Sequence, residues 1–215
     1  MPNLRFITIT SWVIVVVSLA SIAGWLFDIE VLKTVLPGLP SMKVNTAICL
    51  LLCGVVALFF IDDAEKHFNI IVPLNLIAFI LSALTLFEYM FDVNLRIDEF
   101  LVTESAVDAA PGRMALTSAS CLLMLTMGFA FVTAQAPKIF NMAAQGFFFI
   151  VALMAVLAII GYIFDVPFLH NLSMSKSMAL LTAGLLLPQS LVYMAILRGS
   201  VSEASYSAKR RKMIL

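Results

Sequence analysis

The chain has few charged residues, and this scarcity excludes most soluble architectures. Only 12% of its 215 residues are Asp, Glu, Lys or Arg, whereas a soluble globular domain has about 25%. Hydrophobic residues make up 62% of the sequence, compared with about 45–50% in soluble domains. The composition therefore indicates a membrane protein.

Cysteine and histidine are also scarce, and the usual motifs of catalysis are missing. The three cysteines all lie inside apolar runs, so they form neither a disulfide framework nor a zinc-ligand spacing. The two histidines are not at ligand spacing, and no HExxH motif, Walker loop or nucleophile elbow occurs. We therefore expect this region to be no enzyme, and we expect no metal, no cofactor and no nucleic-acid partner.

What the sequence does have is six long apolar runs. Each is close to the roughly 20 residues that an α-helix needs to cross a bilayer, and all are too long for spanning strands. The predicted fold class is an all-α membrane protein with six transmembrane helices in residues 1–197, followed by a basic tail or linker, 198–215. The expected spans are Phe6–Phe27, Val44–Ile61, Asn69–Met90, Met114–Ala134, Ile139–Phe164 and Met178–Leu197.

The basic residues indicate how the spans are oriented. With six spans both termini lie on one side, and that side has eight of the 13 basic residues but four of the 13 acidic ones. Because cytoplasmic loops are enriched in Lys and Arg, we expect both termini in the cytoplasm and a location in a bacterial inner membrane. Half of the eight basic residues lie in the tail: Lys209, Arg210, Arg211 and Lys212.

A short motif ends three of the runs. The sequence has GWLFDI at 24–29, EYMFDV at 88–93 and GYIFDV at 161–166, so an aromatic residue stands three positions before each aspartate. A second motif follows each one: SMKVNTA at 41–47, RMALTSA at 113–119 and SMALLTA at 177–183. The two motifs predict three repeated helical hairpins at about 6–61, 69–134 and 139–197. The residues that start the returning helices are Met42, Thr46, Met114, Ser118, Met178 and Thr182.

The aromatic-aspartate motif has two interpretations. Trp and Tyr favour the membrane boundary, and an aspartate just past an apolar run can end the helix or reach water. Alternatively, the three corners surround an outward-facing pocket that binds a signal molecule or an ion. The candidate ligand-binding residues of this hypothesis are Trp25, Asp28, Glu88, Tyr89, Asp92, Tyr162 and Asp165.

Glu88 is the strongest single candidate among these residues. It replaces the glycine of the other two repeats and precedes Asp92 by four residues, which places both carboxylates on one helical face. Two such groups repel unless one is protonated, paired or bound to a cation, so Glu88 is a candidate for a pH-sensitive or cation-sensitive group. The alternative is a side chain that snorkels to water at the helix end.

Polar residues within the runs give further expectations. Asn75, Gln145 and Gln189 are expected to form interhelical hydrogen bonds, because polar groups within spans face other helices. Pro188 is expected to kink the last helix. The long loop after Asp92 contains NLRIDEFLV, which predicts a short surface helix with Ile97, Phe100 and Leu101 on one face. This loop is either a lid over the pocket or a plain connection.

The three copies of the two motifs, with the apolar residues around them, cover nearly the whole chain. They read GWLFDI with LPSMKVNTAICLLLCGVVALFF, LFEYMFDVNLRIDEFL with PGRMALTSASCLLML, and IGYIFDVPFL with SMALLTAGLLL. They resemble the multi-helix N-terminal membrane region of bacterial sensor proteins, which precedes PAS, histidine kinase or diguanylate cyclase domains. The resemblance implies an input module of a two-component or related signalling system. On this resemblance we expect either that a kinase or cyclase domain lies beyond Leu215 or that the protein is a free-standing membrane module.

We therefore expect a sensory or signal-transducing membrane domain that detects a ligand or ion at its outer face. Its expected partners are the lipid bilayer, the unknown ligand, a cytoplasmic output domain and a second copy in a homodimer. One alternative is a small transporter or channel, although transporters usually have polar groups at mid-membrane. The other alternative is a passive membrane anchor or oligomerisation module.

Overall fold

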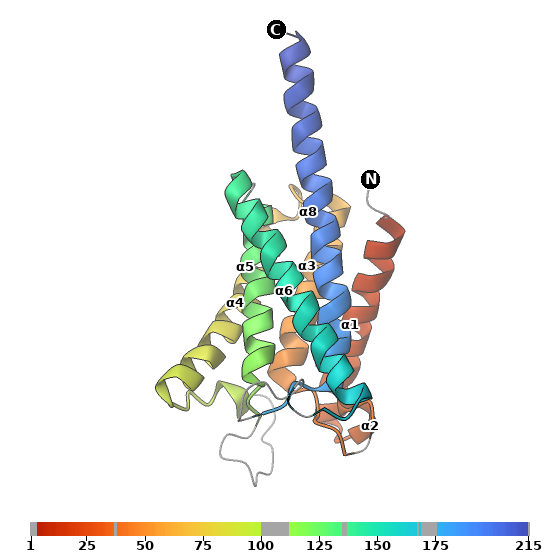
Figure 1. Ribbon diagram of the computed structural model, residues 1–215, viewed down its shortest axis with the longest axis vertical. Helices are drawn as coiled ribbons and strands as arrows, with labels where there is room; N and C mark the ends of the chain where they lie inside the picture. Colours follow the sequence, from red (N-terminus) through yellow and green to blue (C-terminus); the bar gives the residue numbers. More distant parts are fainter. Residues whose placement is uncertain are drawn as a thin grey trace.

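The protein is a bundle of long helices, as a computed structural model shows (Figure 1). The structure describes residues 4–36, 38–99, 112–134, 137–166, 168 and 176–214. In this part of the chain six helices are long and apolar enough to span a membrane, which confirms the predicted fold class. They are α1 (Leu4–Leu26), α3 (Val44–Asp63), α4 (Phe68–Phe91), α5 (Leu116–Thr133), α6 (Lys138–Ile163) and α8 (Leu180–Ile214). The connections include two short helices, α2 (Glu30–Lys33) and the 3-10 helix η1 (Ile97–Glu99).

The three hairpins predicted from the repeat are present. Within each hairpin the two helices pack against each other, as α1 with α3, α4 with α5, and α6 with α8. The predicted helix limits agree to within about two residues, except for the end of α8. The starts of α5 and α8 lie two residues after Met114 and Met178, because these methionines belong to the extended segment that precedes each helix.

The six helices form an inner and an outer set. The returning helices α3, α5 and α8 contact one another, and 50–56% of the residues in their apolar windows are buried. For α1, α4 and α6 the buried share is only 28–33%. Each outer helix packs against two inner ones: α1 on α3 and α8, α4 on α3 and α5, and α6 on α5 and α8. The bundle therefore has pseudo-threefold symmetry about an axis between the inner helices.

Aromatic rings fill the middle of the inner set. The ring of Phe129 in α5 stacks on that of Tyr193 in α8 at 4.3 Å, and Tyr193 donates a hydrogen bond to the Cys53 carbonyl in α3 at 3.2 Å. All three residues are fully or almost fully buried. The three inner helices are thus joined at one level by the packing of these side chains.

Two of the three predicted interhelical hydrogen bonds are confirmed. Asn75 in α4 donates to the Thr126 carbonyl in α5 at 2.9 Å, and Gln189 in α8 donates to the Cys53 carbonyl in α3 at 3.3 Å. The prediction for Gln145 is wrong, because its side chain is exposed on α6. Since α6 is an outer helix with less than a third of its residues buried, a polar residue there can point away from the bundle.

The last helix is longer than the sequence predicted. α8 continues through Pro188 and through the expected tail as far as Ile214. At 1.5 Å per residue its 35 residues extend about 50 Å, well beyond a hydrocarbon core of about 30 Å. Figure 1 shows α8 projecting from the end of the bundle at which α1 begins. We call the opposite end, where α1, α4 and α6 stop, the corner end.

Candidate functional site

The three aspartates of the repeat end their helices in the same way. Asp28, Asp92 and Asp165 all have left-handed backbone conformations, with φ of 54°, 50° and 51°. In each case the next amide donates to the carbonyl five residues earlier: Ile29 to Gly24, Val93 to Glu88 and Val166 to Gly161. This is the Schellman arrangement, which favours glycine but accepts Asn or Asp because their short polar side chains tolerate the left-handed region.

The aspartate side chains themselves are exposed. Asp28 forms an ion pair with the buried Lys33 of α2. The hydrogen bond and the charge of the Lys33 ammonium hold the pKa of the Asp28 carboxyl below its usual value. The pair therefore contributes to stability at neutral pH, and this contribution is lost only as the pH falls through the lowered pKa.

If these aspartates are needed for their backbone conformation, substitutions at Asp165 should affect stability in a predictable way. Asp165→Asn and Asp165→Gly are expected to leave the free energy of unfolding unchanged, because both residues accept a positive φ. Asp165→Val is expected to lower it by about 1–2 kcal/mol, since a branched side chain clashes in this conformation. Chemical unfolding of the purified protein in detergent measures the difference. If Asp165→Asn lowers the free energy of unfolding as much as Asp165→Val does, the carboxylate itself is required.

A side-chain hydrogen bond joins the two motifs in every repeat. Trp25 Nε1 donates to the Met42 carbonyl at 2.7 Å. The hydroxyl of Tyr89 donates to the Met114 carbonyl at 3.0 Å, and that of Tyr162 donates to the Met178 carbonyl at 2.7 Å. The three methionines are buried, with 2% exposure at most. The aromatic residue of the first motif therefore holds the start of the returning helix in place, and we call this bond the hairpin clip.

Removing one clip is expected to weaken the bundle measurably. Tyr162→Phe keeps the ring but leaves the Met178 carbonyl without its donor, so the free energy of unfolding should fall by about 0.5–1.5 kcal/mol. Thr8→Val is the control, because the exposed Thr8 hydroxyl donates only to the Leu4 carbonyl of its own helix. Chemical unfolding in detergent compares the two variants. Equal stability of Tyr162→Phe and the native protein would show that the clip has no structural role.

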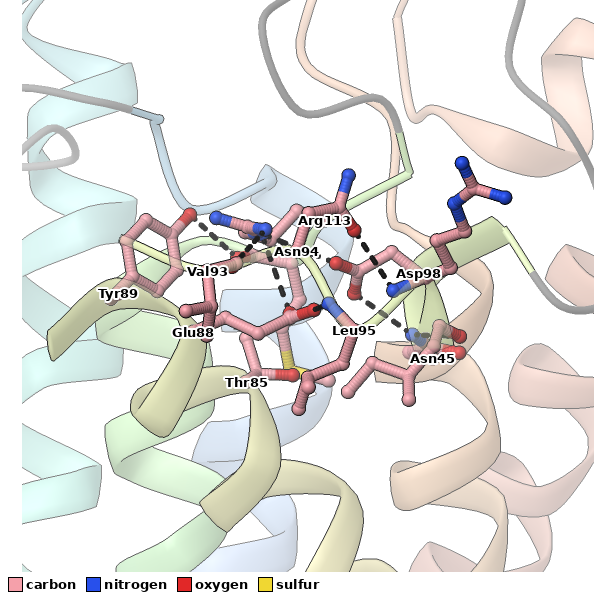
Figure 2. A network of polar contacts seen from close by, with 12 residues as sticks. Asn45, Thr85, Glu88, Tyr89, Val93, Asn94, Leu95, Asp98 and Arg113 are labelled. Atoms are coloured by element: carbon pink, nitrogen blue, oxygen red, sulfur yellow. Dashed lines mark hydrogen bonds and ion pairs between the residues drawn. The ribbon is translucent and has the colours of Figure 1, made fainter. Parts of the chain in front are cut away.

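A buried polar network joins the second repeat to its neighbours (Figure 2). Glu88 is fully buried, and its Oε1 accepts a hydrogen bond from the Leu95 amide at 2.7 Å. Its Oε2 lies 3.4 Å from Arg113 Nε, which also lies 3.2 Å from Asp98 Oδ2. Asn45 at the start of α3 donates to Asp98 Oδ1 at 3.1 Å. One guanidinium thus bridges two carboxylates and connects α3, α4, η1 and the segment before α5.

This network corrects the expectations for Glu88. The side chain does not snorkel to water, since it is fully buried. Its carboxylate partner is Asp98 rather than Asp92, because α4 ends at Phe91 and the positive φ of Asp92 turns the chain away from the helical face. The first repeat has glycine at the equivalent position, where a Cβ on Gly24 would meet Leu32 Cβ at 2.6 Å. A carboxylate side chain is therefore specific to the second repeat.

The inner helices begin around a cavity of about 370 Å³. Its lining follows the second motif of the repeat position by position. The residue before each methionine lines it: Ser41, Arg113 and Ser177. So does the residue after each methionine: Lys43, Ala115 and Ala179. So does the hydroxyl residue four positions after it: Thr46, Ser118 and Thr182. Pro40 and Lys176 are the other described residues of the lining. Because all three repeats contribute equivalent positions, the cavity lies on the pseudo-threefold axis.

The described part of the lining contains basic residues and is rich in hydroxyl groups. Of the eleven described residues that line the cavity, three are cationic, five carry hydroxyls and none is acidic. The Arg113 guanidinium is shared between the carboxylates of Glu88 and Asp98. The Lys43 ammonium also lies 5.5 Å from the centre of the Trp25 ring.

Three helix N-termini meet at this cavity. The first intrahelical hydrogen bonds run from Ala47 to Lys43, from Ala119 to Ala115 and from Ala183 to Ala179, each 3.0 Å long. The N–H groups of the three helical residues before each of these donors consequently have no acceptor within the helix. Neither lysine nor alanine has a side-chain acceptor that could cap them. The cavity is thus surrounded by backbone donors at the positive ends of three helix dipoles.

None of the seven predicted ligand-binding residues lines this cavity. The aspartates are exposed at the corners, the aromatic residues form the clips, and Glu88 lies behind Arg113. Of the residues predicted to start the returning helices, the three hydroxyl residues line the cavity and the three methionines do not. Phe100 and Leu101, predicted to share a face with Ile97, lie outside the described residues, while Ile97 belongs to η1.

No protein-family model matches the chain, and neither does any curated protein or any solved structure.

Proposed function

We propose that the protein is a sensory input module of a bacterial inner membrane. In this proposal a ligand binds in the cavity at the corner end, and α8 transmits the change to a partner at the other end of the bundle. The excess of basic residues near the termini supports a cytoplasmic location for both of them. A cytoplasmic output domain and a second copy of the chain are the proposed partners, in keeping with the resemblance to sensor proteins.

One observation supports this function above the others: α8 reaches from the cavity to the opposite end of the bundle. Thr182 in its first turn lines the cavity, and the helix continues without a break to Ile214. Tyr193 and Gln189 in its middle both donate to the Cys53 carbonyl of α3. A ligand that alters the packing at the first turn therefore acts on a single rigid element that extends beyond the bundle.

The alternative of a channel or transporter has less support. The Phe129 and Tyr193 rings are buried between the inner helices, where a path along the axis would have to pass. The alternative of a passive anchor predicts that the cavity and the far end of α8 are not coupled, and an experiment can test this directly.

The test fills the cavity without any ligand. Thr182→Trp places a large side chain in the cavity, and spin labels at Lys66→Cys and Arg198→Cys report the distance between the α3–α4 turn and α8. Both label sites are exposed, while Cys49, Cys53 and Cys121 are buried. We expect the mean distance in lipid nanodiscs to shift by about 1–2 Å or more, the size of interfacial helix shifts in switching proteins.

Two controls make the result specific. Leu191→Trp adds the same side chain to the exposed face of α8 and should leave the distance unchanged. Ser177→Trp fills the cavity from the segment before α8, in case Thr182→Trp does not fold. Identical distance distributions for the native protein and both cavity-filling variants would contradict a signalling role and favour the passive anchor.

A further inference from the structure

The buried network of the second repeat contains two acids and one base. Glu88 and Asp98 both face the guanidinium of Arg113 (Figure 2). We propose that this network is a proton-binding site: Oε2 of Glu88 carries a proton in the folded protein and releases it when the pH at the corner end rises. The inference goes beyond the proposed function, because it concerns this network and requires no ligand in the cavity.

The hydrogen bonds of the network show which oxygen lacks a donor. Oε1 of Glu88 accepts from the Leu95 amide at 2.7 Å. The Nε–H of Arg113 is donated to Oδ2 of Asp98 at 3.2 Å, and Asn45 donates to Oδ1 of Asp98 at 3.1 Å. Oε2 of Glu88 is buried and accepts no hydrogen bond. A protonated carboxyl group has an O–H donor, so a proton on Oε2 turns an acceptor without a donor into a donor.

The charges of the network are the second and independent argument. Glu88 is 0% exposed, Asp98 6% and Arg113 7%. If both acids were ionised, one negative charge would remain buried without a partner of its own, which is costly away from water. Two carboxylates that share a site resolve this repulsion when one of them is protonated. Because Asp98 has two donors and Glu88 Oε2 has none, the proton belongs on Glu88.

The other elements packed against α4 bring no further charge to Glu88. At the corner end, α3 and α5 have no charged residue within the helix. Lys43, just before α3, directs its ammonium group to the Trp25 ring at 5.5 Å. On α4 itself the Tyr89 hydroxyl forms the hairpin clip, and the Asp92 side chain after the helix is exposed. Among the residues that the structure describes, Arg113 and Asp98 are therefore the charged neighbours of Glu88.

Loss of the proton has a structural consequence at Arg113. Its Nε lies 3.2 Å from Oδ2 of Asp98 and 3.4 Å from Oε2 of Glu88, so a small shift exchanges one acceptor for the other. An ionised Glu88 attracts the guanidinium more strongly than a neutral one. Since Arg113 also lines the cavity, the protonation of Glu88 affects the shape of the cavity wall.

The first experiment detects the proton by infrared spectroscopy. The full chain at pH 7, in a detergent without ester groups, should show the C=O stretching band of a protonated carboxylic acid. The band should be absent from Glu88→Gln and should disappear from the native protein as the pH is raised. Asp165→Asn is the control, because the exposed Asp165 carboxyl is ionised at this pH and its loss leaves the band unchanged.

The second experiment measures the same proton through stability. In the unfolded chain a glutamate is ionised above about pH 5, so unfolding releases the proton of Glu88. The unfolding constant should then rise about tenfold per pH unit more steeply in the native protein than in Glu88→Gln, until the folded protein also loses the proton. The stability that depends on the proton is thus present at low pH and lost as the pH rises. Asp165→Asn should keep the native pH dependence.

The opposite results would overturn the inference. If Glu88 is an ionised partner of Arg113, no acid band depends on Glu88, and Glu88→Gln has the same pH dependence of unfolding as the native protein. A band that persists until the protein unfolds would contradict release of the proton. If Glu88→Gln does not fold, isotopic labelling of the native protein assigns the band: it should shift with labelled glutamate, whereas a shift with labelled aspartate would place the proton elsewhere. The α8 distance measurement is independent of all these outcomes.

Discussion

Arg113→Met is expected to lower the free energy of unfolding by about 3–5 kcal/mol, because removing one partner of a buried ion pair leaves charge buried without compensation. In the native protein the Nε of Arg113 lies 3.2 Å from Asp98 and 3.4 Å from Glu88, and its Nη2 donates to the Val93 carbonyl at 3.1 Å. Glu88 is fully buried and Asp98 is 6% exposed. Chemical unfolding in detergent measures the loss.

The matched control removes the charges together with the arginine. Arg113→Met combined with Glu88→Gln and Asp98→Asn leaves no unpaired ion, so it should recover a large part of the lost stability. Arg113→Lys keeps the charge but not the planar group that reaches all three acceptors, and it should be intermediate. If Arg113→Met loses no more stability than Arg113→Lys does, the guanidinium does not hold the two carboxylates together.

Gly128→Ala is the second substitution with a large expected effect. A Cβ at Gly128 in α5 would lie 2.7 Å from Cε1 of Phe148 in α6. The Phe148 ring is fully buried and packs 5.5 Å from the Tyr193 ring, so it cannot move away freely. Overpacking of this kind costs about 1–3 kcal/mol of the free energy of unfolding. Thermal or chemical unfolding of the variant tests the expectation.

Gly146→Ala in α6 is the control for this substitution. A Cβ there meets no atom within 4 Å, and alanine favours a helix over glycine by up to about 1 kcal/mol. The control should therefore be as stable as the native protein or slightly more stable. Phe148→Leu combined with Gly128→Ala should recover part of the loss. Equal stability of Gly128→Ala and Gly146→Ala would contradict the close packing of α5 and α6.

The fold was predictable because its determinants are periodic. The apolar runs have the length of membrane-spanning helices, and the two motifs occur once in each hairpin, so helix number and pairing follow from the sequence alone. The length of the last helix was underestimated, because the basic residues after Arg198 end the apolar run but not the helix. Apolarity marks where a span ends, whereas a helix ends only where its backbone hydrogen bonds stop.

The polar network was only partly predictable. Glu88 was recognised as exceptional, but its partner was taken to be Asp92 from the four-residue spacing. That spacing holds only within a helix, and the left-handed Asp92 lies just beyond the end of α4. Asp98 and Arg113 are reached through an irregular segment whose path no periodicity describes. Long-range pairing of this kind depends on tertiary structure.

The cavity was missed although its signal was in the sequence. The sequence analysis placed the pocket at the aromatic residues and aspartates of the first motif, because three such corners at one membrane face suggested an outward-facing site. The second motif repeats a hydroxyl residue four positions after each methionine, with Lys43, Arg113 and Lys176 close to the methionines. Since these positions start three helices that converge on one axis, their donors had to face a common space.

The central claim is that the three hairpins direct equivalent hydroxyl residues into one shared cavity at the corner end. Single cysteines at Thr46, Ser118 and Thr182 test it with a small water-soluble thiol reagent, and a single cysteine at the fully buried Ala183 is the control. The native cysteines are buried. We predict that the reagent reacts about tenfold faster or more at each of the three positions than at the Ala183 control, because the three positions open into the cavity. Equal rates at all four positions, or fast reaction at only one of the three positions that line the cavity, would contradict the claim.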